Sequence, residues 1–176
     1  MKFLNPYRFG WGLLVGFQLL FATAAFSANT APNCLGADTR ILPVINSQVL
    51  AWKDSTPNQF HARGHIEGTL QEIYPDHGGH HHWQVQIGSQ PGDNIEVIYN
   101  QDFGAIPTPY VGMNVEACGD FINSNAPTPM YPASPDGAII HWVHMNPDGK
   151  GHLPGFLMMD GTLCGQDPSH AGPKRP

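Results

Sequence analysis

Histidines gather in two short stretches of this 176-residue chain, which contains ten histidines in all. The first stretch reads DHGGHHHW from Asp76 to Trp83, and the second reads GAIIHWVHMNPDGKGH from Gly137 to His152. Neutral imidazole is the commonest protein ligand for zinc and copper. The two stretches therefore raise the question of a metal site.

Alternation along an extended strand decides which histidines of the first stretch can act together. Side chains two residues apart share a face, so His80 and His82 are placed to converge, whereas His81 points with Trp83 to the other side. His77, across the glycine turn, is placed to fold back toward His80. The alternative is a solvated polar hairpin loop, because a run of histidines is only a weak compositional sign of metal binding.

In the second stretch, strict alternation sets His141 and His144 on opposite faces unless the strand bulges or ends at Trp142. A strong turn follows, and it returns His152 beside His144. We interpret His141 as a separate, core-facing residue. A structural role, with a histidine bonded to turn carbonyls, is the alternative for the pair His144 and His152. The candidate site residues are His141, Trp142, His144, Asp148 and His152, and the candidate ligands for zinc or copper are His144, His152, His80, His82 and His77.

Three function classes remain open. The sequence contains no Ser-His-Asp order, phosphate-cradling glycine loop or His-Glu-x-x-His motif, which favours a non-enzymatic binding module for a small-molecule or envelope ligand. The first alternative is a hydrolase of phosphodiester or cell-envelope substrates, in which histidines with Asp148 or Asp102 activate water or carry protons. The second is a structural or partner-binding envelope protein with Tyr110, Tyr131 and Trp83 as contact points.

The first 27 residues predict export. A basic start is followed by an apolar run and by small residues that suit cleavage, so we expect a signal peptide at 1–27 and a periplasmic or secreted protein. A retained anchor is the alternative, but the apolar run is shorter than the roughly 20 residues of a spanning helix, so no stable membrane anchor is expected after cleavage. Loss of Lys2 and Arg8 leaves six basic and fourteen acidic side chains, a net charge of −8. This balance argues against nucleic-acid binding.

Three cysteines in an oxidising compartment allow one disulfide and one free thiol. The sequence does not choose among the three pairings. We favour Cys34 with Cys164, which would join the two flanks of the domain, because Cys118 falls within an expected strand.

The chain between the flanks reads as a mainly β protein. Apolar spacing and Pro43 predict one short helix over Ile41–Asp54. Period-two patterns then predict five strands within 61–74, 80–88, 94–100, 111–123 and 138–146, and 155–164 is a candidate for a further strand or hairpin. Five strands favour a small OB-fold-like barrel, because closure removes the sheet edges. A β-sandwich, which usually needs about seven strands, is the alternative. The expected units are the signal peptide at 1–27, a loop and helix at 28–58, the barrel at 59–148 and a C-terminal extension at 149–176.

The stretch from Gly137 to Leu157 resembles a motif of one protein family. Its order is Gly-x-Ile-His-Trp-x-His, a Pro-Gly turn, another histidine and Gly-[Trp/Phe]-Leu. The matching residues are Gly137, Ile140, His141, Trp142, His144, Pro147, Gly149, His152, Gly155, Phe156 and Leu157. In this motif the chain is similar to a family of small exported bacterial proteins known only as a domain of unknown function. The resemblance spans roughly 61–157 and implies export and a fold, but no reaction. Met145 and Asn146 stand where many relatives carry His-Asp, which puts any role of that aspartate in doubt for this chain.

Overall fold

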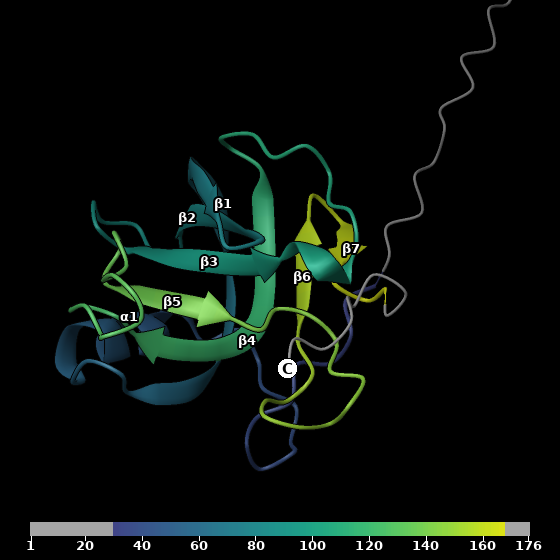
Figure 1. Cartoon of the computed structure of the whole chain (residues 1–176), viewed down its shortest axis with the longest axis horizontal. Coiled ribbons are helices and arrows are strands. Elements are labelled where there is room, and N and C mark those ends of the chain that lie inside the picture. The colour runs from purple at the N-terminus through teal and green to yellow at the C-terminus, as the bar shows by residue number, and fades with distance from the viewer. Residues whose placement is uncertain (1–29, 168–176) are drawn as a thin grey trace, which may run out of the picture.

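A computed structural model describes residues 30–167 and shows a mainly β protein (Figure 1). The expected signal peptide at 1–27 lies outside the described residues. Within the described part, no helix is long and apolar enough to cross a membrane. The elements in chain order are α1 (Asn46–Ser55), β1 (His61–His77), β2 (His80–Gln86), β3 (Asn94–Asn100), the 3-10 helix η1 (Gln101–Phe103), β4 (Asn114–Asn123), β5 (Ala138–His141), β6 (Phe156–Met159) and β7 (Thr162–Cys164).

The seven strands form one sheet in the order β1-β2-β3-β5-β4-β6-β7. A further pairing of β1 with β4 closes the first five of them into a ring. Every neighbouring pair is antiparallel except β3 and β5, which run parallel and lie side by side in Figure 1. The expectation of a mainly β fold with one short helix is therefore confirmed, and the sheet has two strands more than the five expected.

Alternation explains why these segments are strands. Every second residue from Trp83 in β2, from Ile95 in β3 and over 115–121 in β4 is apolar and buried, and these residues form the main core together with residues of β1, β5 and β6. The three strands therefore share one core face, which contains Trp83, Val85, Ile95, Val97, Tyr99, Val115, Ala117 and Phe121. The opposite face of β2 and β3 carries His80 and His82 of the first histidine stretch, together with Glu96.

The helix is present but shorter than expected. It begins at Asn46 rather than Ile41, so Pro43 precedes the helix instead of occupying its first turn. Val49 is fully buried, and Trp52 packs on Phe121 with ring centroids 5.5 Å apart. The expectation of a strand or hairpin near the C-terminus is confirmed by β6 and β7, and β6 continues the sheet along the first half of β4.

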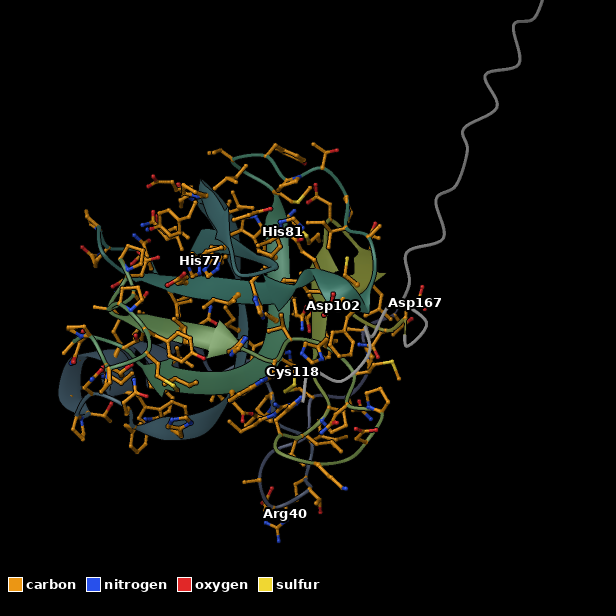
Figure 2. The ribbon with its side chains drawn as sticks, in the orientation of Figure 1. Arg40, His77, His81, Asp102, Cys118 and Asp167 are labelled. Carbon is orange, nitrogen blue, oxygen red and sulfur yellow. A yellow bond between two sulfur atoms is a disulfide. The ribbon has the colours of Figure 1, made fainter. Side chains whose placement is uncertain are left out.

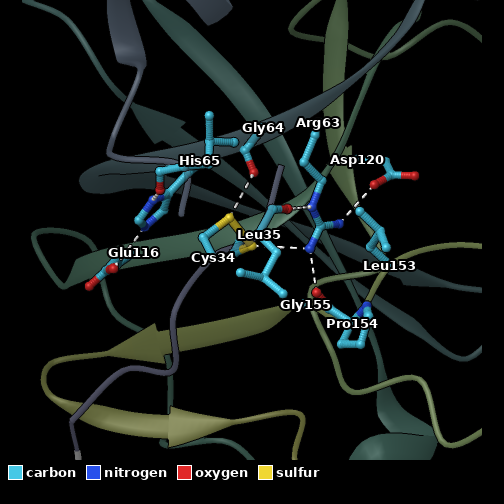
Figure 3. Close-up of a disulfide and its surroundings, with 12 residues drawn as sticks. Cys34, Leu35, Arg63, Gly64, His65, Glu116, Asp120, Leu153, Pro154 and Gly155 are labelled. Atoms are coloured by element: carbon cyan, nitrogen blue, oxygen red, sulfur yellow. Dashed lines mark hydrogen bonds and ion pairs between the residues drawn. A yellow bond between two sulfur atoms is a disulfide. The ribbon is translucent and has the colours of Figure 1, made fainter. Parts of the chain in front are cut away.

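The disulfide joins Cys34 to Cys118, so the expected pairing of Cys34 with Cys164 is wrong (Figure 3). Cys118 points away from the main core, toward the segment that carries Cys34, and both belong to a smaller apolar cluster. Cys164 packs in the main core instead and is a free, buried thiol. The pairing follows from the side of β4 that the N-terminal segment crosses, which sequence spacing does not specify.

Arg63 lies beside this disulfide and joins three parts of the chain (Figure 3). Its guanidinium donates to the Leu35 carbonyl at 3.0 Å, to the Asp120 carboxylate at 2.8 Å and to the Pro154 carbonyl. The arginine side chain is only 5% exposed, so its charge is held in a largely desolvated position by these acceptors. Arg63 thereby anchors the connection between β5 and β6, which carries His152.

Candidate functional site

Parallel pairing of β3 with β5 brings the two histidine stretches together. Val97 on β3 is paired with Ile140 on β5, so the next residue of β3, Ile98, is level with His141. On its other side Ile98 is paired with His82 of β2. Three neighbouring strands thus place His82 and His141 in one row on the polar face, although 59 positions separate them in the sequence.

Five imidazole rings and one indole form a connected group, which we call the histidine cluster. His80 meets His141 with ring centroids 5.5 Å apart and meets His82 at 6.5 Å. Trp142 stacks between His141 and His152, at 4.7 Å and 5.4 Å. His144 meets His152 edge to face at 5.1 Å. The cluster contains His80, His82, His141, Trp142, His144 and His152.

His141 and His144 were expected on opposite faces of one strand, and the early end of β5 explains why both rings lie in the same cluster. The strand ends at His141, and Trp142 adopts a left-handed backbone conformation with φ 54°. This conformation is uncommon for a bulky residue. It interrupts the alternation, so that His144 no longer follows the strand and its ring reaches His152. The expectation of a core-facing His141 is wrong, because Ile140 fills the core and His141 lies on the outer face.

Glycines on neighbouring elements leave room for this segment. A Cβ atom at Gly155 would lie 2.3 Å from the Trp142 carbonyl oxygen, and one at Gly119 would lie 2.3 Å from that of His141. The Gly155 amide donates to the His144 carbonyl at 2.7 Å, and the Met145 amide donates to the Gly165 carbonyl at 2.7 Å. Close backbone approach on both sides therefore fixes the path of the histidine-bearing segment.

Four of the five rings bond through the same nitrogen. Each Nδ1 lies within hydrogen-bonding distance of an oxygen that only accepts, so a neutral ring carries its proton on Nδ1 and leaves the Nε2 lone pair free. A carbonyl or carboxylate on the remote ring nitrogen is the arrangement that orients histidine ligands in metal sites. The pairs are His80 with the Gly78 carbonyl at 3.1 Å, His82 with Glu96 at 2.7 Å, His144 with the Met145 carbonyl at 2.7 Å, and His152 with the Leu153 carbonyl at 2.8 Å.

Burial keeps several of these rings neutral. Desolvation, followed by the nearby His80, lowers the pKa of His141 to about 3. Desolvation also lowers the pKa of His144 to about 4, and it lowers the pKa of His80 below its usual range. These three imidazoles are therefore unprotonated at neutral pH and retain a nitrogen lone pair.

His82 differs from the other rings because its partner is charged. The hydrogen bond to Glu96 raises the pKa of His82. Glu96 is only 5% exposed, and its carboxylate oxygen lies 2.7 Å from Nδ1 of the ring. The other ring nitrogen, Nε2, is buried without a hydrogen-bond partner among the described residues.

A second buried carboxylate, Asp136, lies on the same face but bonds to no histidine. It accepts from Gln84 at 2.7 Å and from the Tyr74 hydroxyl at 3.1 Å. Desolvation, followed by Asp136, raises the pKa of Tyr74. Desolvation likewise raises the pKa of Asp136 itself. This network is thus adjacent to the histidine cluster without entering it.

The remaining candidates lie elsewhere. His81 stacks on Trp83 at 5.5 Å, on the side away from His80, as alternation predicted. His77 is exposed and makes none of the ring contacts that join the cluster; Figure 2 shows His77 and His81 above β3. Asp148 is exposed in the turn after His144. Trp83, expected as a contact point for a partner, is 1% exposed and belongs to the core.

Two residues of the site were missed by sequence reasoning. Phe103 of η1 stacks on His144 with ring centroids 3.6 Å apart, and Glu96 holds His82. Glu96 had a usable signal, since it is the one charged residue inside the strand pattern NIEVIYN. Phe103 had none, because it lies in a short 3-10 helix far from His144 in sequence.

The cluster is not a ready-made coordination sphere. Within residues 30–167, no three His, Cys, Asp or Glu side chains are already arranged to hold one metal ion. Comparison with protein families finds no family model that matches the chain, and a search of curated proteins finds no match. The resemblance carried by Gly137–Leu157 therefore stays a prediction.

Proposed function

We propose that the protein is an exported binding module that holds a zinc or copper ion in the histidine cluster. The single observation that carries this proposal is the common bonding pattern of the rings. Four Nδ1 atoms are each bonded to a carbonyl or carboxylate oxygen, so the Nε2 lone pairs are left for a ligand. Imidazole nitrogens without thiolates suit zinc or copper better than magnesium or calcium, which prefer oxygen.

The ring spacing supports this proposal. Two imidazoles bound to one ion at about 2.0–2.1 Å place their ring centres roughly 5 Å apart. The pairs His80–His141 and His144–His152 are separated by 5.5 Å and 5.1 Å. Because the rings are not yet arranged around a common point, binding requires side-chain rotation. Rotation of the His141 ring breaks no hydrogen bond, since that side chain makes none to another described residue, although it packs on His80 and Trp142.

The topology supports an OB-fold-like barrel as the scaffold. The strand order β1-β2-β3-β5-β4, closed by β1–β4, describes a five-stranded ring of the kind found in OB-folds. OB-folds bind their ligands on the face of strands 2 and 3, which here carries His80, His82 and Glu96. The disulfide between Cys34 and Cys118 suits an oxidising compartment, which supports export.

Metal titration of the untagged mature protein tests the proposal. We expect one ion of zinc or copper per chain by calorimetry and elemental analysis. His141→Ala and His144→Ala should each weaken binding by more than about tenfold, because losing a ligand costs more than losing the partner that orients it. His61→Ala is the control, since His61 is exposed and outside the cluster. Absence of binding to the wild type, or equal affinity in all three variants, contradicts the proposal.

Hydrolysis is the second candidate function, and one observation favours it. Asp102 of η1 lies close enough to His80 for its charge to oppose part of the lowering of the His80 pKa by desolvation, which places a carboxylate beside the cluster. Figure 2 labels Asp102 beyond the end of β3. A carboxylate near an ion with an open coordination position can help to activate water. Zinc-loaded protein that cleaves phosphodiester or cell-wall substrates, and loses this activity in His144→Ala, would favour the enzyme.

A further inference from the structure

Glu96 is a buried carboxylate whose position needs an explanation. It lies on the outer face of β3, yet its exposed fraction is only 5%. Burial of a carboxylate is unfavourable unless a partner compensates its charge. The partner here is Nδ1 of His82, at 2.7 Å. The residues are diagonal neighbours on β2 and β3, because His82 is paired with Ile98 and Gln84 with Glu96.

His82 presents the complementary problem. Its Nε2 atom is buried and makes no hydrogen bond of normal geometry with another described residue, although the backbone of His77 lies near enough to the ring to help raise its pKa after the larger effect of Glu96. A buried polar group without a partner is unfavourable, whether the nitrogen carries a proton or a lone pair. The bond to Glu96 fixes the ring of His82, whose centroid lies 6.5 Å from the centroid of the His80 ring. A bound ion would supply the missing partner.

We infer that Glu96 is the positioning residue of the metal site and that it presents Nε2 of His82 as a ligand beside His80. This inference rests on the proposed function. The rings of His80, His144 and His152 are oriented by neutral carbonyl groups, so Glu96 is the one buried carboxylate that bonds to a ring of the cluster among the described residues. A divalent ion held only by neutral imidazoles keeps its full charge in a poorly solvated place, and Glu96 compensates part of that charge.

Substitution of Glu96 separates orientation from charge. Glu96→Ala removes both, and loss of such an orienting partner weakens metal binding by about 10–100-fold. Glu96→Gln keeps an oxygen acceptor for Nδ1, so we expect partial rescue. Asp136→Asn is the matched control, because Asp136 is a buried carboxylate on the same face that bonds to Gln84 and Tyr74 rather than to a histidine. It should leave metal affinity within about threefold of the wild type.

A spectroscopic measurement on metal-free protein gives an independent result. Nitrogen-15 spectra of the histidine rings, recorded at a pH where they are neutral, should show His82 with its proton on Nδ1. Glu96→Ala should move that proton partly to Nε2, whereas Asp136→Asn should leave the spectrum unchanged. An unchanged proton position in Glu96→Ala would contradict the inference, because Glu96 would then not fix the tautomer of His82.

The outcomes distinguish the two proposals. If the wild type binds zinc or copper and Glu96→Ala binds with equal affinity, the inference about Glu96 is wrong and the proposed function stands. If Asp136→Asn weakens binding as much as Glu96→Ala, general charge rather than orientation is responsible, and the inference is again wrong. If the wild type binds neither ion, both proposals are wrong.

Discussion

The neutral imidazoles of His141, which is half-buried, and His144, which is buried, make the folded protein sensitive to acid. Burial lowers the pKa of His141 to about 3 and that of His144 to about 4, whereas an unfolded histidine titrates near its usual 6.5. Between these values the unfolded state binds more protons, so the free energy of unfolding decreases as the pH falls below about 6.5. The decrease ends only near pH 3, below the folded pKa values.

We expect metal-free protein to lose about 2–4 kcal/mol of stability between pH 7 and pH 5, measured by urea denaturation at several pH values. His144→Asn should reduce this pH dependence, because the variant no longer has that histidine to protonate on unfolding. His61→Ala should retain it, since His61 is exposed. An unchanged pH dependence in variants of both His141 and His144 would show that the two rings are not buried as described.

At the scale of elements, strand positions were predictable from local patterns and strand ends were not. Alternating apolar residues located β2 and β3 almost to the residue, because each has one face in the core. The same reasoning extended the last strand to Asn146, whereas β5 ends at His141. The reason is the left-handed backbone at Trp142, with φ 54°, which a pattern of side-chain types does not reveal.

The meeting of the two histidine stretches was not predictable from local patterns either. It depends on β5 pairing in parallel with β3, beside strands that are distant in sequence. Each stretch taken alone was as consistent with a polar loop as with a ligand site. The topology, rather than either motif, makes one cluster from His80 and His141.

Gly155 tests how tightly the element after β5 is held. A Cβ added at Gly155 would lie 2.3 Å from the carbonyl oxygens of Cys118 and Trp142. These are backbone atoms, so they cannot move aside as the end of a flexible side chain could. We expect Gly155→Ala to cost about 1–3 kcal/mol in urea denaturation, because overpacking displaces the surrounding backbone. It should also weaken metal binding, since Trp142 lies between two rings of the histidine cluster.

Gly92→Ala is a control that should lower the free energy of unfolding by about as much as Gly155→Ala. Gly92 lies in the turn between β2 and β3 with φ 92°, and a Cβ there meets nothing within 4 Å. The substitution strains the backbone by about 1–2 kcal/mol without touching the cluster. Metal affinity should therefore decrease in Gly155→Ala and remain unchanged in Gly92→Ala. Equal affinities would show that the path of the segment around Trp142 does not govern the site.

At the scale of the whole molecule, the disulfide was the feature that sequence reasoning placed wrongly. Composition and the apparent signal peptide indicated one disulfide and one free thiol, and this arrangement is present. The choice of partner depended on which side of β4 the N-terminal segment crosses. Cys118 and Arg63 lie together on that side, where Arg63 also holds Leu35 and Pro154 (Figure 3).

The disulfide therefore links the N-terminal segment to β4 beside Arg63, which also holds the connection carrying His152. Cys34 and Cys118 are 84 positions apart, so their bond restricts a long loop of the unfolded chain. Loops of this length correspond to about 4–5 kcal/mol in the chain-entropy description, and measured losses lie at about 2–5 kcal/mol. We expect the free energy of unfolding of the double variant Cys34→Ala/Cys118→Ala, measured by urea denaturation, to be lower by about 2–5 kcal/mol.

Cys164→Ala separates this loss from a general effect of removing cysteine. The Cys164 thiol is buried, and desolvation raises its pKa to about 11, so little of the reactive thiolate forms at neutral pH. Cys164→Ala should therefore keep the disulfide and cost about 1 kcal/mol through a small cavity. Thiol titration of the unfolded protein without reductant should detect one free thiol in the wild type and none in Cys164→Ala. Two free thiols in unreduced Cys164→Ala would instead restore the pairing of Cys34 with Cys164, and the N-terminal segment would then have to cross the sheet on its other side.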